Sequence, residues 1–121
     1  MKFIIIAALL LPYVASAQVL IETKAERAER CATMTTEIEA AEKAADALIA
    51  TEASTIARSK PGDLDAFLNF HMAANDILRP MNAIASACSV AAPATSTRAA
   101  AVSRRLLDSI GRVQAAQRPR G

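Results

Sequence analysis

The 121-residue chain has few side chains that could carry chemistry: Cys31 and Cys88, a single histidine (His71) and twelve carboxylates. A lone histidine needs further ligands to hold zinc, and a nucleophile and an orienting group to act as a base. The spacing supplies neither, and the sequence contains no Cys-x-x-Cys-His for covalent haem and no Glu-x-x-His for a di-iron bundle. We therefore predict no catalytic, cofactor-binding or metal-binding residue, and no enzymatic activity.

The two cysteines are expected to form a disulfide. Pro61-Gly62 is the predicted turn of a helical hairpin, and Cys31 lies 30 residues before Pro61 while Cys88 lies 26 residues after Gly62. A helix rises about 1.5 Å per residue, so the two thiols should stand about 45 Å and about 39 Å from the turn, at nearly the same height. The alternative is a pair of unbonded, buried thiols.

The N-terminal segment has the pattern of a secretory signal. Lys2 supplies a positive charge, Phe3 to Val14 is apolar, and Ala15-Ser16-Ala17 is a small-x-small cleavage site that would leave Gln18 first. An even number of cysteines is typical of the oxidising compartments that such a signal leads to. We predict a periplasmic or secreted protein. The less favoured alternative is an inner-membrane anchor, because apolar residues resume after Gln18.

Composition favours helices. Of 29 alanines, 25 follow position 17, where the only aromatic residues are Phe67 and Phe70 and the only glycines are Gly62, Gly111 and Gly121. This is unsuited to a β-sandwich, to stacking on single-stranded nucleic acid, or to a glycine-rich phosphate loop. Ten arginines against four lysines, with the many alanines, suggest a GC-rich bacterial source.

Proline and glycine divide the rest of the chain into three helical stretches. The first spans residues 19–59. The second starts at Asp63 as N-cap and continues through Pro80 with a kink, and the third spans residues 96–117, after Pro93 and Thr95-Ser96-Thr97. The core-facing seams are expected to be Cys31, Met34, Ile38, Ala41, Ala45, Leu48, Ile49, Ala53 and Ile56; Leu64, Phe67, Phe70, Ala74, Ile77, Met81, Ile84 and Cys88; and Ala99, Val102, Leu106, Ile110 and Val113.

These seams predict an all-α fold, an antiparallel three-helix bundle with a long first helix. The predicted organisation is a signal peptide over residues 1–17, a bundle domain over 18–117 and a flexible basic tail over 118–121. Because the first helix is the longest, part of its seam should lack an internal partner. That part is expected to bind a protein partner or a second copy.

The C-terminal quarter is basic. From Ala94 onward six arginines oppose Asp108 alone, a net charge of +5, whereas residues 19–60 hold eight acids and six bases, a net charge of −2. Arg98, Arg104, Arg105, Arg112, Arg118 and Arg120 are therefore candidates for contact with a partner or an anionic envelope surface. The alternative is that this helix lies against the acidic first one. Nucleic acid is disfavoured as a partner, because 13 bases and 12 acids leave the mature chain at only +1.

Together these features predict an exported, non-enzymatic helical interaction protein of the bacterial envelope, such as an adaptor, an inhibitor or a small chaperone. If the leader is retained, the alternative is a membrane-anchored coiled-coil stalk or an accessory subunit of an envelope or secretion machine. A third class is a bundle that binds a small apolar ligand near Phe67, Phe70 and Met81.

Overall fold

A computed structural model describes residues 22–59 and 64–117, and this part of the chain is all-helical, without a strand. The helices are α2 (Lys24–Thr33), α3 (Thr35–Ala50), α4 (Glu52–Arg58), α5 (Asp65–Ala87) and α6 (Pro93–Ala116). The all-α prediction is confirmed. The predicted signal peptide, the Pro61-Gly62 turn, the Asp63 cap and the basic tail lie outside the described residues.

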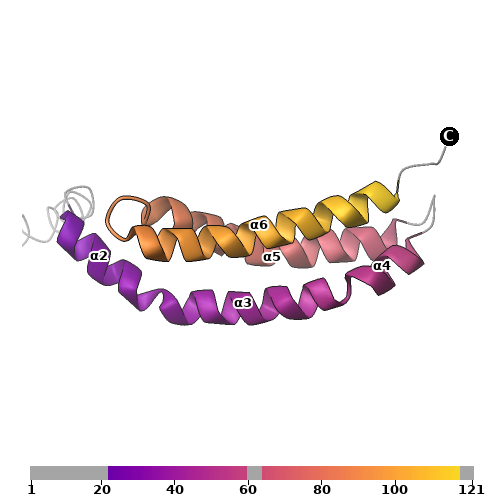
Figure 1. Ribbon diagram of the computed structural model, residues 1–121, viewed down its shortest axis with the longest axis horizontal. Helices are drawn as coiled ribbons and strands as arrows, with labels where there is room; N and C mark the ends of the chain where they lie inside the picture. Colours follow the sequence, from indigo (N-terminus) through magenta and orange to yellow (C-terminus); the bar gives the residue numbers. More distant parts are fainter. Residues whose placement is uncertain (1–21, 60–63, 118–121) are drawn as a thin grey trace, which may run out of the picture.

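The helices form an elongated body. Helices α2, α3 and α4 follow one another end to end, and α5 and α6 lie lengthwise beside them (Figure 1). Five residues, 88–92, connect α5 to α6, and such a short connection makes these two helices antiparallel neighbours. Both α5 and α6 contact α3 and α4, so that buried side chains from all three lines of helix meet along one axis.

The continuous first helix predicted for residues 19–59 is interrupted at Met34 and Thr51. At Met34 the backbone N–H bonds the carbonyl of Cys31, and the Thr33 hydroxyl occupies the Arg30 carbonyl at 2.6 Å. That carbonyl would accept the Met34 N–H in an unbroken α-helix. At Thr51 both the backbone N–H and the side-chain hydroxyl bond the Leu48 carbonyl. Threonine hydroxyls thus compete for backbone acceptors and divide the helix.

Two other helix boundaries differ from the prediction. Helix α6 begins at Pro93, three residues early, because proline suits the first helical turn, where its missing N–H is not needed. Ser96, expected near the cap, instead donates its hydroxyl to the Ala85 carbonyl of α5 at 2.5 Å. Helix α5 begins at Asp65, two residues after the predicted N-cap. It contains Pro80 in its interior, as expected, and the kink at that proline stays a prediction.

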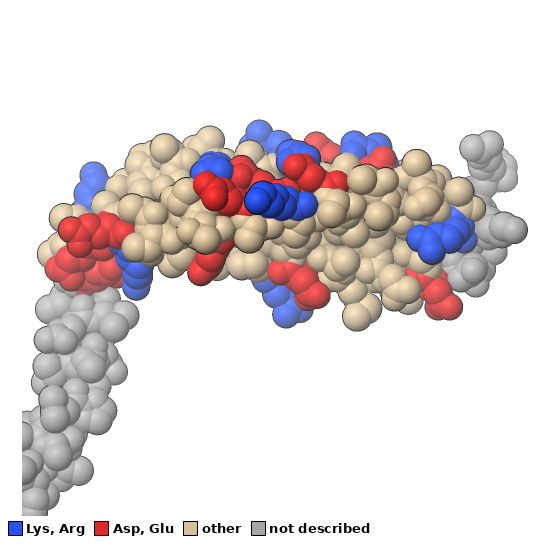
Figure 2. Space-filling model, turned by 90° about the horizontal axis from the view of Figure 1, so that it is seen from below, with Lys and Arg blue, Asp and Glu red and all other residues tan. Residues whose placement is uncertain are grey.

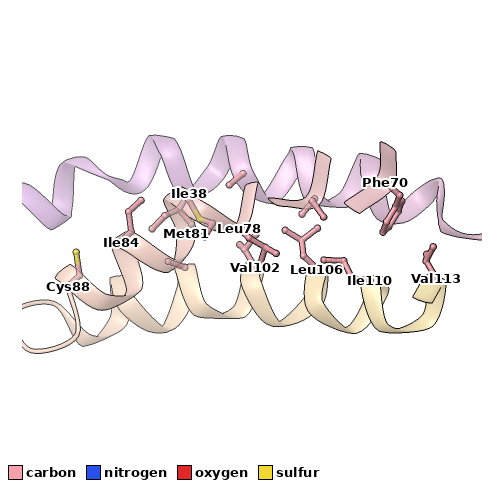
Figure 3. Close-up of a cluster of buried hydrophobic side chains, with 14 of the residues drawn as sticks. Ile38, Phe70, Leu78, Met81, Ile84, Cys88, Val102, Leu106, Ile110 and Val113 are labelled. Atoms are coloured by element: carbon pink, nitrogen blue, oxygen red, sulfur yellow. The ribbon is translucent and has the colours of Figure 1, made fainter. Parts of the chain in front are cut away.

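The buried apolar side chains form one row between the helices (Figure 3). All five residues predicted for the third seam are buried, as are Phe70, Ala74, Met81, Ile84 and Cys88 of the second and Cys31, Ile38, Ala41 and Ala45 of the first. The prediction was wrong for Leu64 and Ala53, which are exposed, while Met34, Leu48, Ile49, Ile56 and Phe67 are half-buried. Ile77 is also only half-buried, because Leu78 takes the core position instead.

The regular spacing of buried positions in the first seam continues into α4, but the buried residues there are polar. The predicted seam shifted to Ile49, Ala53 and Ile56, whereas the buried positions after Leu48 are the polar residues Thr55 and Ser59. Thr55 donates its hydroxyl to the Thr51 carbonyl at 2.9 Å, and Ser59 donates to the Thr55 carbonyl at 2.7 Å. Because these hydroxyls are satisfied within their own helix, they can face the interior at little cost.

Candidate functional site

Cys31 and Cys88 form a disulfide at one end of the row of buried side chains. Their Cα atoms are 5.9 Å apart and 57 positions separate them in the sequence. Both are almost fully buried, on α2 and directly after α5. The pairing predicted from their equal heights is confirmed. The bond ties the start of α2–α4 to the end of α5, where no other covalent link holds these helices together in the described part of the chain.

A row of ion pairs joins α6 to α3 and α4. Arg98 donates two hydrogen bonds to the Glu42 carboxylate, from Nε at 3.0 Å and from Nη2 at 2.6 Å. Further along α6, Arg105 binds Asp46. Arg112 binds Glu52, with its Nε 2.9 Å from both carboxylate oxygens. Three of the candidate arginines therefore bind carboxylates of the same chain.

These pairs lower the pKa of two of the carboxylates. The hydrogen bonds from Arg98 hold the pKa of Glu42 below its ordinary value of 4.5. Hydrogen bonds from Arg112 and then from Ser109 lower the pKa of Glu52 in the same way. Ser109 is fully buried and donates its hydroxyl to Oε1 of Glu52 at 2.5 Å. Both glutamates are therefore anionic at neutral pH, in hydrogen bonds that hold α6 in place.

The other candidate arginines are not brought into this row. Arg104 is exposed, and among the described residues no carboxylate lies within ion-pair distance of it. Arg118 and Arg120 lie outside the described residues. Of the four candidate arginines that the structure describes, three are therefore engaged with acidic partners, and Arg104 is not.

An apolar groove runs between helices α2 and α3 on one side and α5 on the other. One cavity of about 350 Å³ lies beside the disulfide, and a second of about 330 Å³ follows it, with Glu37 and Pro80 lining both. We call the two together the α3–α5 groove. Its walls are Arg30, Cys31, Met34, Glu37, Ala40, Ala41 and Ala44 on one side, and Asp76, Ile77, Pro80, Met81, Ala83, Ile84, Ala87 and Cys88 on the other.

The two sides of α3 therefore differ. Toward α6 it is held by ion pairs, whereas no ion pair crosses between α3 and α5 within residues 22–59 and 64–117. Four alanines, two on each wall, are exposed in the groove: Ala40, Ala44, Ala83 and Ala87. Figure 2, which views the molecule from the α3 side, shows charged side chains in small groups of both signs separated by broad uncharged surface. This groove was not predicted, because it arises from small residues on two helices that are far apart in the sequence.

The remaining chemistry-bearing residues are not assembled. His71 is half-buried, its ring centre lies 5.7 Å from that of Phe67, and its Nδ1 has no hydrogen-bond partner among the residues that the structure describes. In the described ranges, no three His, Cys, Asp or Glu side chains gather where they could hold a metal ion. None of the described helices combines the length and the apolar character needed to cross a membrane.

Comparison with models of known protein families, with curated proteins and with solved structures found no match for this chain.

Proposed function

We propose that this protein is an exported, non-enzymatic helical interaction protein of the bacterial envelope, such as an adaptor, an inhibitor or a small chaperone. In this proposal the helices make an antiparallel three-helix bundle with α2–α4 as its long first member. The partner-binding surface is the α3–α5 groove. Nucleic acid and cofactors play no part.

The observation that carries the proposal is the apolar groove, which lies on the side of α3 that no described ion pair closes. A half-buried Ile77 and an exposed Pro80 line it together with the four exposed alanines. An apolar groove between two helices is a surface into which an amphipathic helix of a partner protein can dock. A fourth helix laid between α3 and α5 would complete a four-helix arrangement and remove this surface from water.

The disulfide supports export. Bonds of this kind persist in the periplasm and outside the cell and are rare in the reducing cytosol. Its position at one end of the groove also fixes the distance between α2 and the end of α5, so that the groove keeps its width without a ligand.

Export is tested by the intact mass of the protein recovered from its host, measured after thiol alkylation with and without reductant. We expect a chain that begins at Gln18 and is alkylated only after reduction. A chain that retains Met1 would favour the anchored stalk, and free thiols in the recovered protein would contradict export to an oxidising compartment.

The binding surface is tested in the same host with a photo-crosslinking amino acid. It is placed at Ala40 on one wall, at Ala87 on the other, and at Ala101, an exposed α6 position outside the groove, as the control. We expect the same adduct from Ala40 and Ala87 and none from Ala101. Equal adducts from all three positions, or none from either wall, would contradict the assignment.

A further inference from the structure

Two carboxylates face the α3–α5 groove from opposite walls. Glu37 on α3 and Asp76 on α5 both line its second cavity, and both are exposed. Neither has an ion-pair partner among residues 22–59 and 64–117, although five ion pairs occur elsewhere in that part of the chain. The cation at the end of the groove, Arg30, is engaged by Glu22 at 2.9 Å. The middle of the groove therefore carries two carboxylates that have no ion-pair partner in the described part of the chain.

This charge selects among the occupants that an apolar groove could take. A purely apolar helix would press against Glu37 and Asp76 and remove part of their hydration without replacing it, which is unfavourable. An anionic lipid would also bring its headgroup close to two carboxylates along the groove. A lysine or arginine between them would instead form charge-assisted hydrogen bonds with both.

The shape of the groove favours a helix as occupant. Its walls are α-helices whose backbone groups are bonded within each helix, so an extended peptide would find no free strand edge to pair with. From Arg30 to Ala44 the groove spans fourteen residues of helix, which corresponds to about 21 Å. The exposed alanines on both walls allow another helix to approach closely, because their side chains are small.

We infer that the occupant of the α3–α5 groove is a cationic amphipathic helix of a partner protein, with a lysine or arginine of its apolar face placed between Glu37 and Asp76. This inference rests on the proposed function and names the chemistry of its partner. The apolar residues of that helix would supply contact area, whereas the two carboxylates would supply selectivity, since an acidic helix in the same place would be repelled.

The test uses three labelled amphipathic peptides of about 18 residues, long enough to span the groove. They differ only in the residue at the centre of the apolar face, which is lysine, glutamine or glutamate, and binding to the oxidised protein is followed by fluorescence anisotropy. We expect the lysine peptide to bind most tightly, by about fivefold or more over the glutamine peptide, with the glutamate peptide weakest. The double variant Glu37→Gln/Asp76→Asn should bind all three with similar affinity.

A second pair of variants locates the peptide. Ala44→Trp fills the groove and should abolish binding, whereas Ala101→Trp adds the same side chain to α6 outside the groove and should not. Peptides that bind with no lysine preference, yet are excluded by Ala44→Trp, would overturn the inference while leaving the groove as a binding surface. Failure of every peptide to bind, or binding that ignores Ala44→Trp, would overturn both. A stable dimer dissolved by Ala44→Trp would assign the groove to a second copy and contradict the inference.

Discussion

Arg98 on α6 binds both carboxylate oxygens of Glu42 on α3, at 3.0 and 2.6 Å. With the pairs formed by Arg105 and Arg112, this places three of the four arginines of α6 against carboxylates of α3 and α4. Helix α3 is therefore held by ion pairs on the side that faces α6. The other side of α3, toward α5, carries the apolar groove, and the functional proposal follows from this difference.

The first prediction compares substitutions at two adjacent residues, one in the core and one on the groove wall. Leu78→Ala should lower the free energy of unfolding by about 3 kcal/mol, because it leaves a cavity in the row of buried side chains. Ile77→Ala should cost about half as much, because this half-buried side chain packs against the core from the groove wall. Urea denaturation followed by circular dichroism measures both. Equal losses would show that both side chains are core residues.

The second prediction concerns the disulfide. The double variant Cys31→Ala/Cys88→Ala should keep the helical content and lose up to about 4 kcal/mol of stability, because the closed loop of 57 residues no longer restricts the unfolded chain. Adding reductant to the unmodified protein should give a similar loss. Identical denaturation midpoints for the variant and the oxidised protein would contradict a structural role for the bond.

The third prediction is a loss of stability in acid. The pKa of Glu52 is lower in the folded protein than its ordinary value of 4.5, so its contribution is fully present above pH 4.5 and is lost as the pH falls through the folded pKa. Glu42 acts in the same direction. The melting temperature should therefore fall below pH 4.5, and less steeply in Glu52→Gln. An unchanged slope in that variant would argue against the Arg112 and Ser109 contacts.

The fourth prediction concerns the buried hydroxyl of Ser109. Ser109→Ala removes its hydrogen bond to Glu52 and should cost about 1 to 2 kcal/mol. Ser86→Ala, at an exposed position of α5, is the matched control and should be neutral. In a double-mutant cycle with Glu52→Ala, the coupling energy should be about 1 kcal/mol. Additive losses would mean that the two side chains do not interact in solution.

Helix content and the cysteine pairing could be predicted from the sequence, because both depend on regular spacing. The seam of Cys31, Ile38, Ala41 and Ala45 is apolar and regularly spaced. The predicted turn placed Cys88 and Cys31 at nearly the same height along the two helices, and the two residues are paired. The third seam was predictable for the same reason, since its apolar residues lie on one face without competition.

The departures arise where polar side chains decide the structure. Thr33 and Thr51 interrupt the first helix through hydroxyl bonds to backbone carbonyls, which hydrophobic spacing does not reveal. Thr55 and Ser59 face the interior because their hydroxyls are satisfied locally, so following only the apolar residues into α4 missed these two buried positions and included the exposed Ala53. The groove was missed because it depends on the exposed alanines of both walls, whose small size matters only once two helices are placed side by side.

The decisive experiment is a chemical-shift map of isotope-labelled, oxidised protein titrated with the lysine peptide. We expect the shifting backbone amides to cluster at Glu37, Ala40 and Ala44 on α3 and at Asp76, Ala83 and Ala87 on α5, with α6 little affected. Shifts that gather instead around Arg104 and the exposed side of α6 would contradict it, and would move the binding surface to the opposite side of the molecule.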